Sequence, residues 1–296
     1  MRKEAQNMSE REGRLDQQAS IMHHDESVAA KLKRLVSSQS YAYMRTVMIE
    51  MLHLEENQAL QIVDVGCGEG AFCRDVSARV GRGSQIIGLD VSENVLDIAR
   101  AQGNGDQTRG EIAYMVGDMM HLPFSDASCD VVICAGTLKY LETEERERAA
   151  LEEMMRVLRP GGTLLVLDND DYSITYAGVE DEELERKVVG AYASLQGDAQ
   201  CGLRLPALCA DLGLEGVEYR EVLLEETNDF SLETAGRAMA DNMHDVLVQR
   251  AQSHTQDSMV TEDEVERFYG QVQDAVHNGA YQWRYSKYAL VGKKKG

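Results

Sequence analysis

The stretch VDVGCGEGAF at residues 63–72 decides the fold of this chain. It contains the end of a short, nearly continuous apolar run at 61–65, which is typical of a strand covered on both faces in a parallel sheet. Three glycines then open a helical stretch: Gly66, Gly68 and Gly70. Because they lack side chains, backbone N–H groups at the start of the helix can approach a ligand closely. The stretch therefore predicts a strand–turn–helix unit with a small-molecule site at its turn.

The segments that follow repeat this unit. Further strands are expected at 85–89, 112–116, 131–135 and 163–167, with helices between them, among them 93–101 and 144–158. Strands that alternate with helices at this spacing indicate βαβ units. The predicted fold class is therefore α/β, with a doubly wound and mostly parallel sheet.

Three parts are expected along the chain. Residues 1–55 are predicted to form an N-terminal helical lid, 56–168 the ligand-binding core, and 169–296 the remainder of the sheet with a helical cap. Two segments of the last part, about 169–200 and 229–280, are too long for simple connections, since most loops are short. We expect these two segments to cover the open edge of the sheet and to form the substrate site there.

Composition excludes several classes of partner. Thirty basic and 51 acidic residues give a formal net charge of −21, and a field of that sign repels nucleic acids and anionic membranes. No apolar run approaches the roughly 18 residues of a spanning helix, and the charged N-terminus does not resemble a signal peptide. Six cysteines without a paired CxxC motif predict neither a disulfide scaffold nor a metal site. A cytoplasmic location is expected, and the sequence carries no signal of oligomeric state.

Acidic residues stand at the ends of three successive predicted strands. Asp64 precedes the first glycine, where a carboxylate can hold a cationic ammonium, and Asp90 is placed to accept hydrogen bonds from both hydroxyls of a ribose. Asp118, after the third strand, can read an adenine edge together with the next backbone N–H. The carboxyl ends of parallel strands meet at one edge, where such folds bind ligands. A dinucleotide-dependent oxidoreductase uses a similar turn and remains an alternative, although the glycine spacing and the Gly117–Asp118 pair disfavour it.

Residues 62–168 resemble the class I S-adenosylmethionine-dependent methyltransferases, because VDVGCGEG, GLDVS, GDMMHLPF and LRPGGTLLVLD follow in the order and spacing of that family. The resemblance implies a seven-stranded sheet with an antiparallel last strand. It implies cofactor contacts from Asp64, Gly66, Cys67, Gly68, Asp90, Val91, Asp118 and Met119, with Cys134 and Ala135 at the start of the segment that lines the methyl-transfer site. The expected function is direct SN2 methyl transfer from S-adenosylmethionine to an oxygen, nitrogen or carbon of a small metabolite, a biosynthetic intermediate. A non-catalytic relative that binds the cofactor for regulation remains a second alternative.

The segment after the fourth strand, CAGTLKYL, lacks the Pro-Pro turn with which nucleic-acid amino-methylases grip a flipped base. Many small-molecule relatives place a histidine near Tyr140, so no general base carries over at that position. The remaining candidates for a catalytic role are His23, His24, Tyr140 itself and Asp168. A sulfonium is already a strong methyl donor, so a base is needed only for an acceptor that is protonated at the working pH.

Three further groups have two interpretations each. Arg45 either pairs with the carboxylate of the cofactor or lies on the surface. The acidic run LDNDDY at 167–172 is either a solvated polar loop or a group that attracts a cation. The aromatic residues that follow it and those of the last strand either line the acceptor site or pack in the core: Tyr172, Tyr176, Tyr281, Trp283 and Tyr285.

Overall fold

The computed structural model describes residues 34–55, 58–103, 109–141, 143–227, 234–252 and 259–296. Within them an eight-stranded sheet has the order β3-β2-β1-β4-β5-β8-β6, and β7 pairs with β8. The strands are β1 (Gln61–Val65), β2 (Gln85–Asp90), β3 (Glu111–Val116), β4 (Cys129–Ala135), β5 (Leu158–Asn169), β6 (Thr175–Ala177), β7 (Leu214–Thr227) and β8 (Gln282–Lys294). The helices are α3 (Gln39–Leu52), α4 (Ala71–Ser77), α5 (Glu93–Ala101), α6 (Glu144–Val157), α7 (Glu182–Ala193), α8 (Cys201–Cys209), α9 (Ala235–Gln252) and α10 (Glu262–Asn278), with 3-10 turns η1 (Leu138–Leu141) and η2 (Asp171–Ser173).

The strand directions confirm the predicted α/β class. Strands β1 to β5 pair with one another in parallel, whereas β8 runs antiparallel to β5, β6 and β7. The expected count of seven strands is one too low, because β6 was not foreseen. Strand β8 is longer than the part that pairs with β5, and its first residues, 282–284, pair with β6 instead. Backbone N–H and C=O groups of β8 without hydrogen-bond partners would destabilise the fold, and pairing with β6 supplies such partners at residues 282–284.

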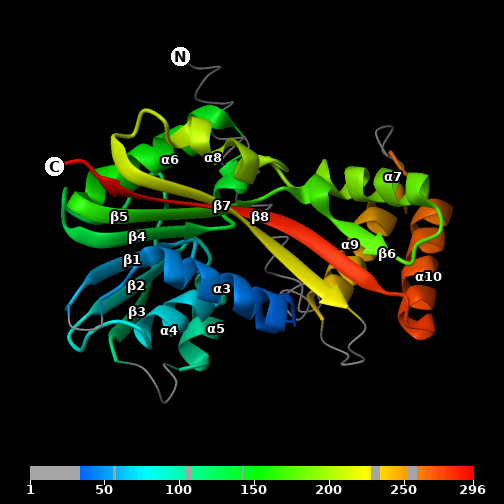
Figure 1. The fold of residues 1–296 in the computed structure, drawn as a ribbon, viewed down its shortest axis with the longest axis horizontal. Helices are drawn as coiled ribbons and strands as arrows, with labels where there is room; N and C mark the ends of the chain where they lie inside the picture. The colour runs from blue at the N-terminus through cyan, green and yellow to red at the C-terminus, as the bar shows by residue number, and fades with distance from the viewer. Residues whose placement is uncertain (1–33, 56–57, 104–108, 142, 228–233, 253–258) are drawn as a thin grey trace.

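The sheet is covered on both faces, which explains the continuous apolar character of its strands. Neighbouring residues of β1 point into different cores: Ile62 packs in the cluster that contains α3 and α4, and Val63 in the cluster that contains α6 and α8. Figure 1 shows α3 across one side of the sheet, with α6 and α8 above it. Helix α3 packs against α4, β5, β7 and β8. The described part of the expected N-terminal lid is therefore a layer of the core.

A smaller helical part lies beyond the core. Strands β7 and β8 run side by side from the core sheet toward α7, β6, α9 and α10 (Figure 1). We call α7, β6, α9 and α10 the cap. The apolar core that contains α3 and α4 continues into the cap, where Trp283 of β8 is fully buried and the rings of Tyr176 and Phe268 meet edge to face with centroids 5.6 Å apart.

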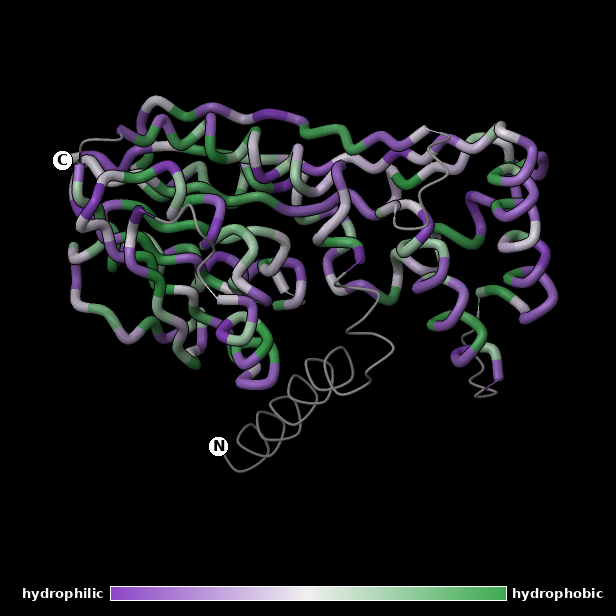
Figure 2. Tube along the Cα trace, turned by 90° about the horizontal axis from the view of Figure 1, so that it is seen from below, coloured by the Kyte–Doolittle hydropathy of each residue, from purple (hydrophilic) through white to green (hydrophobic). Residues whose placement is uncertain are grey.

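The cap helices are amphipathic, as Figure 2 shows by the alternation of hydrophobic and hydrophilic residues along them. Helix α10 buries Val265, Phe268 and Val272 on one side. It begins with a capping box formed by Thr261 and Glu264. Among the described residues, no helix combines the length and the apolar composition that a membrane crossing requires.

Candidate active site

The glycine turn follows β1 as predicted and is fixed by backbone hydrogen bonds. The N–H groups of Gly66 and Cys67 donate to the carbonyl oxygen of Leu89 at 2.7 and 3.0 Å, which ties the turn to the end of β2. Gly66 has φ +74°, and a Cβ there would lie 2.4 Å from Oγ1 of Thr137, so the protein itself requires this glycine. Gly68 has φ +54° but nothing within 4 Å of a Cβ position. The space beside Gly68 is open, as a close approach to a ligand requires.

The three acidic residues at the strand ends have different surroundings. Asp90 accepts hydrogen bonds from the N–H groups of Gly68 and Ser92, both at 3.0 Å, and so links the glycine turn to the start of α5. Asp118 is exposed and accepts from the N–H of Met120 at 2.8 Å, and its carboxylate lies 3.6 Å from Nδ1 of His121. A parallel register between β1, β2 and β3 brings all three acidic residues to the same edge.

Asp64 is the buried member of the three. Its side chain is 3% exposed, and Oδ2 accepts a hydrogen bond from Sγ of Cys73 at 3.2 Å. Burial raises the pKa of Asp64 to about 7; the Cys73 hydrogen bond opposes this shift and the charge of Asp90 adds to it. No basic side chain among the described residues makes an ion pair with Asp64. A buried carboxylate of this kind fits a ligand that carries its own positive charge.

The other predicted cofactor residues are spread around this edge. Val91, which follows β2, is exposed, and Met119, which follows β3, is buried. Cys134 is fully buried at the end of β4, whereas Ala135 lines a cavity. Arg45 points toward α4, where Nε lies 2.6 Å from Asp75 and Nη1 donates to the carbonyl oxygen of Val36. The candidates His23 and His24 lie outside the described residues.

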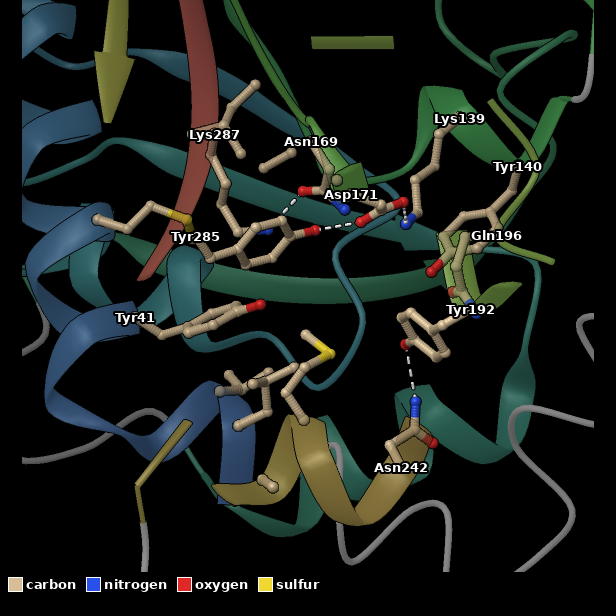
Figure 3. A pocket seen from close by; sticks show the side chains of 18 of the residues that line it. Tyr41, Lys139, Tyr140, Asn169, Asp171, Tyr192, Gln196, Asn242, Tyr285 and Lys287 are labelled. Carbon is tan, nitrogen blue, oxygen red and sulfur yellow. Dashed lines mark hydrogen bonds and ion pairs between the residues drawn. The ribbon is translucent and has the colours of Figure 1, made fainter. Parts of the chain in front are cut away.

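A cavity of about 270 Å³, partly open to solvent, lies between the carboxyl edge of the sheet and the cap. Residues of α3, of the segment after β4, of the end of β5, of α7, of α9 and of β8 line it (Figure 3). Ala135 and Gly136 belong to the lining, so the cavity opens next to the segment predicted to line the methyl-transfer site. Tyr140 also lines it, and burial raises the pKa of its hydroxyl.

The acidic run after β5 points inward. Asp171 forms an ion pair with Nζ of Lys139 at 2.7 Å and accepts a hydrogen bond from the hydroxyl of Tyr285. Asp168 accepts from the backbone N–H groups of Lys139 and Asn169, at 3.2 and 2.9 Å. The interpretation as a solvated loop is wrong for Asp168 and Asp171, which are buried because Lys139 and these N–H groups compensate them. Burial raises the pKa of Asp168 to about 6, against the opposing charge of Lys139.

Sequence reasoning missed Lys287, which projects from β8 into the same cavity (Figure 3). Its Nζ donates to Oδ1 of Asn169 at 2.5 Å and lies 5.0 and 4.7 Å from the ring centroids of Tyr41 and Tyr285. Burial, and then repulsion from Lys139, lowers the pKa of Lys287 to about 8. The signal was present in the sequence, because alternation along β8 places Lys287 on the face of Tyr285, two residues earlier.

The aromatic residues divide between the two interpretations. Tyr285 lines the cavity, whereas Tyr176 and Trp283 are buried where the apolar core extends into the cap. Tyr281 is also buried, and Tyr172 is half exposed.

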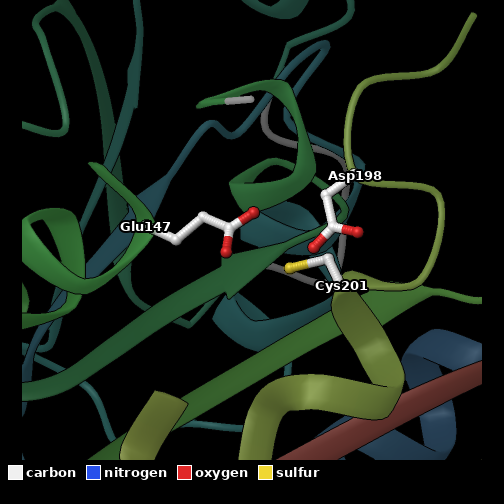
Figure 4. Close-up of side chains that lie close together, drawn as sticks. All are labelled: Glu147, Asp198 and Cys201. Carbon is white, nitrogen blue, oxygen red and sulfur yellow. The ribbon is translucent and has the colours of Figure 1, made fainter. Parts of the chain in front are cut away.

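A second polar cluster lies away from the cavity. The side chains of Glu147, Asp198 and Cys201 converge between α6 and α8 (Figure 4). The guanidinium of Arg204 already contacts the carboxylates of Glu147 and Asp198. Burial raises the pKa of Glu147 to about 7, although Arg204 opposes the shift. The arrangement is an ion-pair cluster centred on Arg204.

Comparison with known proteins agrees with this geometry. A family profile for a methyltransferase domain matches residues 63–166. Over these residues the chain is similar to methyltransferases. It is 33% identical to the demethylmenaquinone methyltransferase of Lactococcus lactis subsp. lactis over 139 residues, which are 47% of this chain and 52% of that protein. The chain thus spans about half the length of the curated relatives that it matches first.

Two solved structures share the fold of this chain. Phosphoethanolamine N-methyltransferase 2 of Haemonchus contortus, in complex with S-adenosyl-L-methionine, matches 95% of this chain and 60% of its own, with a TM-score of 0.59 and 13% identity. The YcgJ protein of Bacillus subtilis matches 86% of this chain and 99% of its own, with a TM-score of 0.53 and 18% identity. At these identities the likeness establishes the methyltransferase fold.

Proposed function

We propose that this chain transfers the methyl group of S-adenosylmethionine to an oxygen, nitrogen or carbon of a small-molecule acceptor. The observation that carries the proposal is the continuity of two sites: the acidic residues and glycine turn at the strand ends lie at the same edge as a cavity that begins at Ala135. A partly open cavity of about 270 Å³ suits a small molecule or part of one. The proposed acceptor is therefore a metabolite rather than a polymer, in agreement with the net charge of −21.

The residues at the turn fit the proposed cofactor. Asp64 offers a buried carboxylate to the ammonium group, and the open side of Gly68 leaves room for the methionine part. Asp90 is oriented by two backbone N–H groups, and its remaining lone pairs can accept from ribose hydroxyls. We assign the adenine to Asp118 and Met119. Arg45 stays a candidate for the cofactor carboxylate, although Asp75 now competes for its guanidinium.

S-adenosylmethionine, when bound, supplies a methyl group on a positively charged sulfur. The acceptor nucleophile forms a bond to the methyl carbon as the carbon–sulfur bond breaks and its electron pair passes to sulfur. The contribution of the chain is to align the two partners and to exclude water between the sheet edge and the cap. Alignment of this kind supplies about 7–11 kcal/mol in favourable cases.

The test is a calorimetric titration with S-adenosylhomocysteine. We expect micromolar binding by the wild type, loss of binding in Gly66→Arg, and a roughly 10- to 100-fold weaker affinity in Asp90→Ala, because hydrogen bonds to a charged group are lost. Asp97→Ala is the matched control, because Asp97 lies on α5 with its side chain 66% exposed and should leave the affinity unchanged. Absence of binding by the wild type would contradict the proposal.

Two further measurements separate the alternatives. Thermal stabilisation by NADH but not by S-adenosylhomocysteine would favour a dinucleotide-dependent oxidoreductase. Incubation of the protein with methyl-labelled cofactor and a metabolite extract tests turnover, since a regulatory protein would bind the cofactor without labelling any metabolite. The relative from Lactococcus lactis is named for demethylmenaquinone, so a quinol is one acceptor to include. The predicted cytoplasmic location remains a prediction.

A further inference from the structure

The most unusual group in the cavity is the ammonium of Lys287. The residue is 4% exposed, and its Nζ lines the cavity at the carboxyl end of β5. Of its three N–H donors, one is used by Oδ1 of Asn169. In the part of the chain that the structure describes, no carboxylate accepts a hydrogen bond from Lys287.

The nearby carboxylates are occupied elsewhere. Asp171 is engaged by Lys139 and by the hydroxyl of Tyr285, and Asp168 by two backbone N–H groups. Both still act on Lys287 through space, whereas Lys139 repels it. The rings of Tyr41 and Tyr285 give partial compensation through their π faces. Buried cations in proteins are normally paired, so this ammonium lacks the partner that its burial demands.

The cavity has room for an anionic group that could pair with the ammonium of Lys287. Tyr41 approaches Lys287 from α3, Tyr285 from β8 and Asn169 from β5, as Figure 3 shows. The remaining direction faces the cavity, which Ala135 and Gly136 connect to the segment predicted for methyl transfer. A ligand oxygen with negative charge that occupies the cavity can therefore reach Nζ.

We propose that Lys287 binds the acceptor through an anionic oxygen, either the ionised hydroxyl of a phenol or enol or a carboxylate. This inference rests on the proposed methyl transfer and adds the chemical class of the acceptor. The paired Lys139 differs, because its charge is already neutralised by Asp171 at 2.7 Å. Lys287 is thus the acceptor-binding residue of the pair.

The same contact prepares a hydroxyl for the reaction. With a pKa of about 8, part of the Lys287 population is neutral near physiological pH, and a neutral amine can take the proton of a phenol or enol. The product is the same ammonium–oxyanion pair that forms when the acceptor arrives ionised. The oxyanion, or a carbon conjugated with it, then forms the bond to the methyl carbon, and the electron pair of the broken carbon–sulfur bond stays on sulfur. A carbon acceptor afterwards releases its ring proton to water.

The experiment uses two probes on the full chain saturated with S-adenosylhomocysteine. Binding of 4-nitrophenol is followed by its phenolate absorbance at a pH where the free phenol is mostly protonated, and binding of benzoate by calorimetry. A phenolate spectrum with the wild type identifies an ionised hydroxyl as the ligand, and preference for benzoate identifies a carboxylate. We expect roughly 10- to 100-fold weaker binding of the preferred probe in Lys287→Met, and near wild-type binding in Lys287→Arg, which keeps the charge.

Two further variants make the test specific. Asn169→Asp places a carboxylate on Lys287 and should weaken probe binding by at least about tenfold with the lysine still present. Lys293→Met is the control, since Lys293 is exposed on the same strand and should leave binding unchanged. Circular dichroism verifies the fold of each variant, and Asn169→Asp and Lys287→Arg carry the test if Lys287→Met does not fold.

The outcomes separate this inference from the proposed function. Failure of both probes to bind the wild type, or equal binding by Asn169→Asp and the wild type, overturns the role of Lys287. If S-adenosylhomocysteine still binds when the Lys287 test fails, the proposed methyl transfer is not contradicted. Loss of S-adenosylhomocysteine binding in the wild type overturns the proposed function and this inference with it.

Discussion

Binding of the cofactor should depend on pH through Asp64. This carboxyl is 3% exposed and has a pKa of about 7, chiefly because burial disfavours its charge. A ligand ammonium selects the ionised form, so a proton leaves Asp64 whenever binding begins from the neutral form. Affinity for S-adenosylhomocysteine should therefore rise as the pH rises through about 7.

The size of the effect follows from the pKa. With a pKa of about 7, roughly one Asp64 in eleven is ionised at pH 6 and about three in four at pH 7.5. The apparent affinity should differ about eightfold between these conditions, or ~1.2 kcal/mol. For the unbound protein the sign is opposite. A carboxyl whose pKa is raised by folding makes the folded state less stable as the pH rises from its unfolded value through about 7.

The assay is calorimetry at pH 6 and pH 7.5 in pairs of buffers that differ in ionisation enthalpy. The dependence of the heat on the buffer counts released protons, and about 0.9 per ligand is expected at pH 6. Asp64→Asn is the isosteric variant that should bind more weakly at pH 7.5 and lose the pH dependence. Asp97→Asn, on the exposed side of α5, should retain both.

Two results would refute this reasoning. The first is an affinity of the wild type that is the same at both pH values, with no proton released at pH 6. The second is an unchanged slope with pH in Asp64→Asn, which would place the titrating group elsewhere.

Two predictions concern stability, measured by urea unfolding. Gly66→Ala should cost at least about 2 kcal/mol, because its Cβ would meet Thr137 at 2.4 Å, whereas Gly68→Ala, with open space at its Cβ, should cost only about 1 kcal/mol from its positive φ. A similar loss in both would contradict the assignment of the two glycines. Arg204→Met should cost about 3 kcal/mol because it leaves the buried Glu147 unpaired, and adding Glu147→Gln should restore part of the loss. A double variant less stable than Arg204→Met would argue against the ion pair.

The glycine turn and the core strands could be predicted from the sequence because each is encoded locally. A nearly continuous apolar run and a glycine triplet mark the first strand and its turn, an acidic residue stands at the end of each of the first three strands, and parallel pairing then places Asp64 and Asp90 at one edge. Arg45 shows the limit of this reasoning. Its position on α3 was visible in the sequence, but its partner Asp75 depends on how α3 packs against α4.

The cavity could not be predicted in the same way, since it is assembled from elements far apart in the sequence. Lys139 and Asn169 are unremarkable polar residues in their local contexts, and alternation along β8 gives the face on which Lys287 lies but not the groups that it meets there. Their burial arises from the meeting of the segment after β4, the end of β5 and β8 under the cap. The strand β6 was missed for a related reason, because three residues carry too little pattern to be distinguished from a loop.

The long pair of β7 and β8 affects how the cavity can open. Its pairing is unbroken from Gln282 to Val291, and over part of this length β8 is also bonded to β5. The strand pair therefore connects the cap to the core sheet, and β5 holds part of this pair in place. Bending of this strand pair distributes small changes in backbone dihedral angles over many residues. Its free-energy cost grows with the displacement of the cap. We therefore expect any movement of the cap to involve bending and twisting of β7 and β8 together, rather than rotation about a single flexible residue.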